Sequence, residues 1–161
     1  DTPVFKKSRN LFALNFAKGT KEPALILAEG YMDVVALHQA GFANAVATLG
    51  TSLTAEQARM ISQYADEVVI AYDADGAGQK ATNRAINMFG EIGLKVRVLK
   101  VKDAKDPDEF IKKFGATRFR LERHGVRNWQ AAAKVRFGFA GRKGGLFKGI
   151  CPVYGGHSQS D

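Results

Sequence analysis

The sequence predicts an α/β fold in which a central, mostly parallel sheet of about four strands is flanked by helices. Three observations lead to this fold class. Short, mostly apolar runs alternate along the first 120 residues with segments long enough for helices, which is the pattern of βαβ units. The first of these runs is wholly apolar, as in a strand buried on both faces. The first and third runs end at acidic residues, Glu29 and Asp73, which mark strand ends.

The four expected strands differ in pattern. We predict them at residues 24–28 (ALILA), 44–48 (NAVAT), 68–72 (VVIAY) and 95–101 (KVRVLKV). The third is rich in β-branched residues, which favour strands. The fourth alternates polar and apolar residues, so we expect a half-exposed strand at the edge of the sheet.

Helices are expected between and after these strands. The segment that holds Val34 and ends at Gly41 is long enough for three turns and a C-terminal glycine. Thr54 and Gln57 form a capping box at the start of the next helix. Apolar residues within 81–89 predict a third helix that ends near Gly90 or Gly93. A short fourth helix is expected over residues 108–114, ending at Gly115.

The chain length of 161 residues fits one domain and excludes a second large one. We divide the chain into an upstream basic subdomain or linker (1–22), an α/β domain (23–118) and an irregular, Gly-rich basic tail (119–161). The net charge is +8, and residues 121–161 contribute +5 of it, with 7 basic and 2 acidic side chains. The stretch 137–149 is either a nucleic-acid-binding arm or part of a non-native extension.

Composition excludes several protein classes. No apolar run approaches the roughly 18 residues that a membrane span needs, so we expect no membrane partner. The charged N-terminus has no apolar signal core. The single cysteine, Cys151, excludes an internal disulfide and a Cys-rich zinc site, so we expect no zinc in this chain. A cytoplasmic location follows as an expectation.

Acidic residues follow three of the four predicted strands. Because ligands bind beyond the carboxyl ends of parallel strands, we expect these side chains to lie at one edge of the sheet. Clustered carboxylates repel one another unless a cation is present, and hard oxygen ligands suit Mg²⁺ or Mn²⁺. The residues concerned are Glu29 and Asp33 after the first strand, Asp73 and Asp75 after the third, and Asp106 and Asp108 after the fourth.

Other interpretations of these residues stay open. Asp73-Ala-Asp75-Gly76 alone is typical of a turn and helix cap, and Glu29 alone is typical of a solvated strand end. An EF-hand calcium loop is excluded, because its glutamate would fall at Arg84. The sequence has no P-loop, no dinucleotide-binding glycine motif and no nucleophile elbow. His38 is interpreted as a surface or packing residue.

Four motifs in a fixed order resemble one known family. EGYMD, TLGTSLT, DADGAG and DPDEF are similar to the Toprim domain of bacterial-type DNA primases, the DnaG family. The upstream stretch TPVFKKSRNLFALNFAK is similar to the element that precedes that domain. The resemblance covers about residues 1–118, and the segment from LERHGVRNWQ onward does not share it.

The resemblance implies a Toprim fold and a set of site residues. Asp73 and Asp75 would be ligands of Mg²⁺ or Mn²⁺, with two or more ions possible, and Glu29 a metal ligand or general base. Further members of the acidic site would be Asp33, Asp106 and Asp108. Basic and aromatic residues implied to contact nucleotide or template are Lys7 and Arg9, with Tyr31 and Lys80 as weaker candidates.

The activity implied by this resemblance is the synthesis of short RNA primers on a single-stranded DNA template. A primer 3′-hydroxyl would attack the α-phosphate of a ribonucleoside triphosphate with the help of metal ions. A replicative helicase would bind through a region outside this chain, in the bacterial replisome. Two alternatives use the same residues: a Toprim nuclease or topoisomerase-like enzyme, and a non-catalytic DNA-binding mediator module.

Overall fold

The computed structural model describes residues 2, 4–50, 52–99 and 104–124, and for residues 121–124 only the backbone. Its four strands are β1 (Ala24–Ala28), β2 (Ala45–Ala47), β3 (Glu67–Ala71) and β4 (Lys95–Val98). The helices are η1 (Lys7–Arg9), α1 (Leu14–Ala17), α2 (Tyr31–Gln39), α3 (Ala55–Ser62), α4 (Gly76–Glu91) and α5 (Pro107–His124). Within the described residues, no helix is both long and apolar enough to span a membrane.

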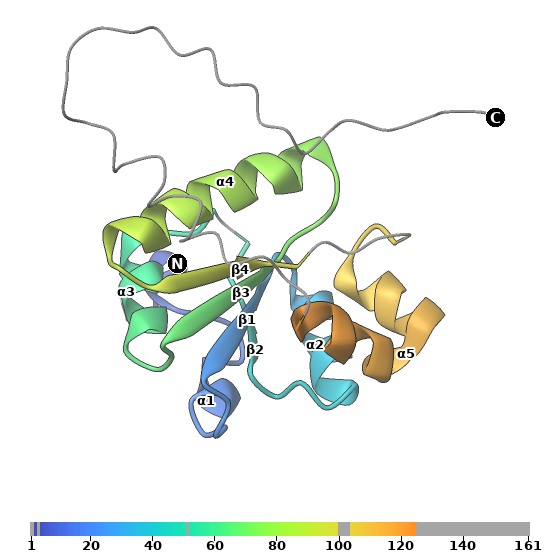
Figure 1. The fold of residues 1–161 in the computed structure, drawn as a ribbon. Coiled ribbons are helices and arrows are strands. Elements are labelled where there is room, and N and C mark those ends of the chain that lie inside the picture. Colours follow the sequence, from blue (N-terminus) through green and yellow to red (C-terminus); the bar gives the residue numbers. More distant parts are fainter. Residues whose placement is uncertain (1, 3, 51, 100–103, 125–161) are drawn as a thin grey trace, which may run out of the picture.

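The strands form one parallel sheet in the order β2-β1-β3-β4 (Figure 1). Every residue of β1 is buried, as expected for a parallel strand covered on both faces. β4 lies at the edge and is only partly buried, so the alternating pattern of its sequence predicted its place correctly. The predicted α/β fold with a four-stranded parallel sheet is confirmed.

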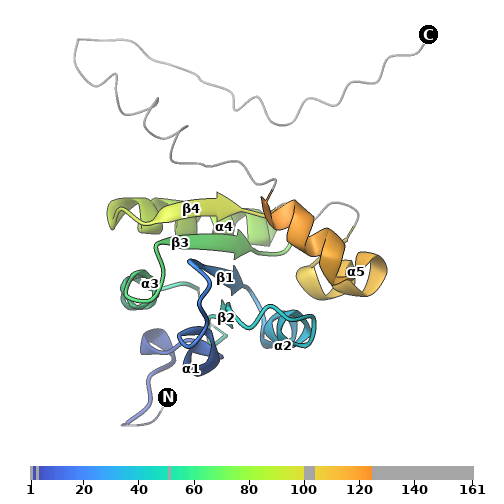
Figure 2. The ribbon, with the colours of Figure 1, turned by 60° about the horizontal axis from the view of Figure 1, so that its bottom comes forward.

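Helices cover both faces of the sheet (Figure 2). On one face, Leu27 and Ile70 pack with Ile61 of α3 and Phe89 of α4. On the other face, the intervening strand residues pack with α2 and α5. Side chains of successive residues in a strand point to opposite faces, so each strand contributes to both core clusters. A fully buried side chain such as Phe89 stabilises the fold by about 2 to 3 kcal/mol.

Two helices begin earlier than their apolar residues suggested. α2 begins at Tyr31, and α4 begins at Gly76, directly after Asp75. Both helices therefore begin within a few residues of a strand end and bring their first turns to the carboxyl edge of the sheet. The predicted capping box of α3 is confirmed, since Thr54 Oγ1 accepts from Gln57 N at 3.2 Å and Thr54 N donates to Gln57 Oε1 at 3.0 Å.

Helix α5 confirms the predicted helix stop at Gly115 but corrects the prediction that an irregular tail begins at residue 119. Gly115 does break the helical geometry, with φ 80° and ψ 165°, but helical structure resumes and continues to His124. Phe119 explains this, because its ring is fully buried, 4.9 Å from the Phe42 ring between centroids. The predicted arm at 137–149 lies outside the described residues.

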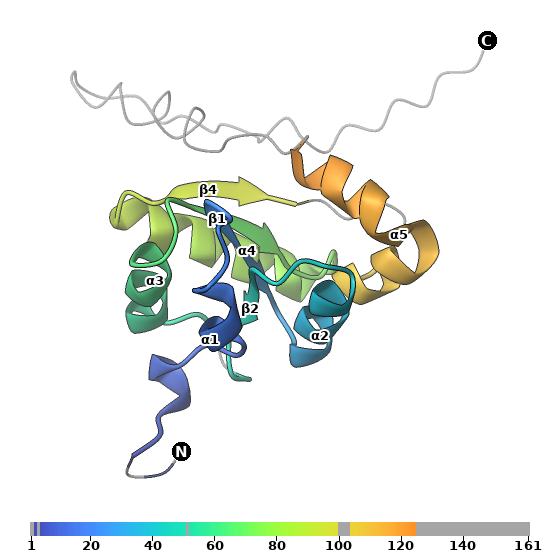
Figure 3. The same ribbon diagram turned by 90° about the horizontal axis from the view of Figure 1, so that it is seen from below.

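The segment before β1 packs on the sheet. Phe12 pairs with Ala47 in an antiparallel bridge, and Leu11 and Ala17 join the core on the α3 and α4 side. Figure 3 shows η1 and α1 near β2 and α3. The assignment of residues 1–22 to an upstream subdomain stays a prediction, but residues 11–17 share this domain's core.

Candidate functional site

The acidic residues meet where the order of the sheet reverses. From β1 the chain moves outward to β2 and then returns to β3 on the opposite side of β1. Ala28 and Ala71, the last residues of β1 and β3, are paired across these neighbouring strands. Ligands of open α/β sheets bind at this switch point, outside the carboxyl ends of the strands. Glu29 and Asp73 follow the two strands here.

Glu29 is the first residue after β1. Burial raises the pKa of its carboxyl group, and the negative charges of Asp73 and, more weakly, Asp75 raise it further. A hydrogen bond from the Asp73 backbone acts in the opposite direction and lowers that pKa. Glu29 is therefore held against the loop after β3 in a place where its charged form is disfavoured.

The motif Asp73-Ala74-Asp75-Gly76-Ala77-Gly78 forms both a helix cap and part of the acidic cluster. Asp75 Oδ1 accepts a hydrogen bond from Gly78 N at 2.7 Å and so caps α4. The backbone of Asp73 lies so close to Gly78 that a Cβ there would be 2.2 Å from the Asp73 carbonyl oxygen. The motif can therefore cap α4 and still contribute carboxylates to a metal site.

Asp73 lies between the other acidic residues. Burial raises the pKa of its carboxyl group, and the charges of Asp106 and Asp75 raise it further, while Lys105 lowers it. The Lys105 carbonyl accepts a hydrogen bond from Ala74 N at 3.0 Å, which ties the loop after β3 to the loop before α5. This bond brings Asp106 to the cluster although it follows a different strand.

Asp33 lies in the first turn of α2 and is only 8% exposed. Its Oδ2 accepts a hydrogen bond from Gly30 N at 3.1 Å. Burial raises the pKa of Asp33 to about 6; the backbone hydrogen bond from Gly30 opposes this shift, and the charges of Asp106 and Asp73 add to it. Asp33 therefore belongs to the same electrostatic cluster as Glu29 and Asp73.

The two aspartates before and within α5 are placed differently. Asp106 Oδ1 accepts from Glu109 N at 2.8 Å and caps the helix, while its charge acts on Asp33 and Asp73. Asp108 Oδ2 is 2.6 Å from Lys112 Nζ, one turn along α5. One Asp108 oxygen is thus engaged in a local ion pair, and its predicted role as a metal ligand remains a prediction.

The predicted basic and aromatic residues lie on η1, α2 and α4. Lys7 and Arg9 belong to η1, whose backbone is held by α3 through Gln57 Nε2, which donates to Lys7 O at 3.0 Å. Lys80 is exposed on α4. The Tyr31 ring packs on Phe12, with centroids 5.1 Å apart, and is 42% exposed. Roles of these residues in binding nucleotide or template stay predictions.

The carboxylate cluster suits a divalent cation by its chemistry. Among the residues that the structure describes, no group of three His, Cys, Asp or Glu side chains is already arranged around one metal position. Burial raises the pKa of Glu29, Asp33 and Asp73 at this edge, and repulsion by neighbouring carboxylates raises each of them further. A bound cation would remove that repulsion, and oxygen ligands of this kind favour Mg²⁺ or Mn²⁺.

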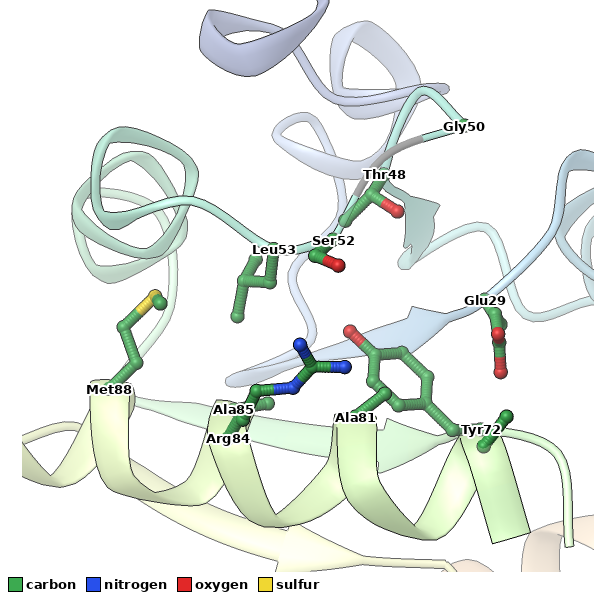
Figure 4. Close-up of a pocket in the computed structure, with 11 residues that line it drawn as sticks. Glu29, Thr48, Gly50, Ser52, Leu53, Tyr72, Ala81, Arg84, Ala85 and Met88 are labelled. Atoms are coloured by element: carbon green, nitrogen blue, oxygen red, sulfur yellow. The ribbon is translucent and has the colours of Figure 1, made fainter. Parts of the chain in front are cut away.

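Sequence reasoning missed a cavity of about 420 Å³ beside Glu29. Figure 4 shows Tyr72 and Arg84 reaching into it, with Ser52 opposite. Burial and the charge of Glu29 raise the pKa of the Tyr72 hydroxyl, whereas Arg84 lowers it. The available signal was Arg84, a cation on the same helix as three alanines and a methionine that line the cavity: Ala77, Ala81, Ala85 and Met88.

Comparison with known proteins agrees with this geometry. A family model described as Toprim-like matches residues 26–111. The chain belongs to the Toprim-like family. The carboxyl edge of its sheet, with Glu29, Asp73 and Asp75, lies within the matched range.

Toprim-like relatives of this chain are DNA primases. The DNA primase of Clostridium acetobutylicum is 49% identical over 120 residues, which are 74% of this chain and 20% of that protein. The DNA primase of Halalkalibacterium halodurans is 44% identical over 124 residues, 76% of this chain and 21% of that protein. The chain spans about a fifth of the length of these relatives. The resemblance to bacterial DNA primases is confirmed.

Solved structures give the same result for this Toprim-like chain. The zinc-binding and RNA polymerase domains of Aquifex aeolicus primase match with a TM-score of 0.78 at 39% identity, covering 86% of this chain and 35% of that one. A DnaG primase catalytic domain bound to single-stranded DNA matches with a TM-score of 0.74 at 34% identity, covering 81% and 44%.

Proposed function

We propose that this chain forms the metal-binding catalytic domain of a DNA primase, which makes RNA primers on single-stranded DNA by nucleotidyl transfer. The observation that carries the proposal is the group of carboxylates with raised pKa values at the switch point of a primase-like sheet. Primase relatives match this chain over about three quarters of its length. A cytoplasmic location in bacteria and a helicase partner stay predictions.

Glu29, Asp73 and Asp75 would hold the divalent cation, with Asp33 and Asp106 contributing negative charge around them. When bound, Mg²⁺ or Mn²⁺ would lower the pKa of the attacking 3′-hydroxyl and stabilise the charge on the leaving pyrophosphate. Asp75 caps α4 with Oδ1, so its other oxygen stays available for the cation. Glu29, whose pKa is raised by burial and by the charge of Asp73, would act as a metal ligand or as a general base.

The partners that this activity requires are a single-stranded DNA template, ribonucleoside triphosphates and the growing RNA primer. Support for the template comes from the DnaG catalytic domain whose structure is bound to single-stranded DNA. Exposed basic residues Lys7, Arg9 and Lys80 are the proposed contacts for phosphates. A nuclease or a binding module would use the same edge, and the products of the reaction distinguish them.

A product assay with matched variants tests the proposal. The full chain is incubated with single-stranded DNA, ribonucleotides and Mg²⁺ or Mn²⁺, and short RNA products, DNA cleavage and DNA binding are measured in parallel. We expect metal-dependent di- and oligoribonucleotides from the wild type and from Glu91→Gln, an exposed carboxylate on the far end of α4. We expect at least a hundredfold loss in Asp73→Asn, about the size of losing one key transition-state contact.

Two results would contradict the proposal. Metal-dependent cleavage of the DNA without RNA synthesis would favour the nuclease. RNA synthesis that is equal in Asp73→Asn and in the wild type would remove the acidic cluster from the mechanism.

A further inference from the structure

The cavity beside Glu29 is lined by Arg84, a cationic residue to which the proposed function assigns no role. It lies between α4, the loop that follows β2 and the ends of β1 and β3 (Figure 4). Leu53 and Met88 line one part of it, and Glu29 and Tyr72 line the other. At about 420 Å³ it falls within the range of roughly 300 to 1,000 Å³ that small-molecule sites occupy. Its size and its place at the switch point both suit a ligand.

Arg84 points into this cavity from α4. Among the residues that the structure describes, none forms a hydrogen bond or an ion pair with its guanidinium group. The Tyr72 hydroxyl lies close to this group, and Glu29 lies beyond the Tyr72 ring (Figure 4). A guanidinium group without a carboxylate partner in a cavity is suited to bind an anion, and its planar donors match phosphate oxygens.

Hydroxyl groups add to this anion-binding character. Ser52 lies opposite Arg84, and Thr48, which is 5% exposed, lines the same cavity. The carboxylates at the other side of Tyr72 would repel a free anion. They would favour an anion that also binds a divalent cation, as the phosphates of Mg²⁺-bound nucleotides do.

We propose that Arg84 binds a phosphate group of a metal-bound polyphosphate in this cavity. The source of the polyphosphate is either the triphosphate of an incoming nucleotide or the pyrophosphate that the reaction releases. The choice of a nucleotide or pyrophosphate as the ligand rests on the proposed function. The inference that an anion binds here rests only on the cavity and on Arg84. Ser52 would donate a further hydrogen bond to the same phosphate.

Titration calorimetry with the full chain tests this site. Three ligands are used: Mg²⁺ alone, Mg²⁺ with ATP, and Mg²⁺ with pyrophosphate. We expect Arg84→Ala to weaken the binding of ATP or pyrophosphate by about tenfold or more, as expected for losing a hydrogen bond to a charged group. Mg²⁺ binding alone should not change. Arg84→Lys should recover part of the affinity, because it keeps the charge and loses the planar donors.

Arg59→Ala is the matched control. Arg59 is exposed on α3, does not line the cavity and carries the same charge, so this variant should bind all three ligands as the wild type does. Arg84 is also exposed, and circular dichroism should show an unchanged unfolding midpoint for both variants. Loss of ATP binding alone would identify the triphosphate as the ligand, and loss of pyrophosphate binding alone would identify the product.

The outcomes separate this inference from the proposed function. Equal affinity of Arg84→Ala and the wild type for ATP and pyrophosphate would overturn the inference, as would a wild type that binds neither. Asp73→Asn is titrated with Mg²⁺ in parallel. If it binds Mg²⁺ as the wild type does, the metal site of the proposed function fails, whatever the result for Arg84.

Discussion

The two ends of the parallel sheet use charge in opposite ways. At the amino end, Glu67 begins β3 and forms an ion pair with Arg97 of β4, and their side chains are 18% and 21% exposed. At the carboxyl end, burial and repulsion by neighbouring carboxylates raise the pKa of both Glu29 and Asp73. The charge of Lys105 lowers the pKa of Asp73, but it does not offset the effects that raise it. At the amino end opposite charges form an ion pair, whereas at the carboxyl end several negative charges lie close together.

This difference distinguishes an edge that is stabilised by an ion pair from the edge at which we propose that a cation binds. A paired carboxylate stabilises the folded state, because its charged form is favoured there. A carboxylate with a raised pKa destabilises the folded state at neutral pH, because folding places its charge in a less favourable environment. The carboxylates at the carboxyl edge therefore repel one another, and a bound cation would reduce this repulsion. Substitutions that remove a carboxylate charge should therefore lower the free energy of unfolding at the amino end and raise it at the carboxyl end.

The largest effect should come from the backbone of the carboxyl edge. In Gly78→Ala, the new Cβ would lie 2.2 Å from the Asp73 carbonyl oxygen, so the loop or α4 must move. We expect a loss of about 3 kcal/mol in the free energy of unfolding, measured by urea denaturation. Gly76→Ala is the control, since its Cβ meets nothing within 4 Å. Similar stability losses in both variants would contradict this account of the loop.

At the amino edge, Glu67→Gln removes the charge that pairs with Arg97. We expect a loss of about 1 to 2 kcal/mol, between the values for exposed and for fully buried pairs. A double-mutant cycle with Arg97→Gln isolates the coupling between the two side chains. A coupling energy near zero would show that this end of the sheet does not use charge for stability.

At the carboxyl edge, the same chemical change should stabilise the protein. Asp33 has a pKa of about 6 in the folded state, above its ordinary value. Without metal, the folded state takes up a proton between these two values, so stability rises as the pH falls from 7 towards 4. Asp33→Asn should raise the free energy of unfolding at pH 7 by about 1 kcal/mol and flatten this pH dependence. Asparagine keeps the oxygen that accepts from Gly30 N.

Thermal unfolding at several pH values without divalent ions measures this effect. A loss of stability in Asp33→Asn at pH 7, or an unchanged pH dependence, would contradict the assignment of Asp33 to the repelling cluster.

Local pattern predicted the strands well. The apolar run of residues 24–28 coincides with β1, and the acidic residues after the first and third strands do share one edge, because parallel strands end together. Contacts between distant residues escaped prediction. Gly115 interrupts the helix as expected, but burial of Phe119 against Phe42 continues it to residue 124. The cavity position of Arg84 depends on the packing of α4 beside the loop after β2, which no local pattern reveals.

The binding of a divalent cation at the carboxyl edge is the central claim, and the thermal unfolding midpoint with and without Mn²⁺ tests it most directly. A ligand that binds only the folded state raises this midpoint. We predict that saturating Mn²⁺ raises it by several degrees, roughly the size expected for 1 to 3 kcal/mol, in the wild type and in Glu67→Gln. The increase should be lost in Asp73→Asn. An equal increase in Asp73→Asn and the wild type would contradict the account.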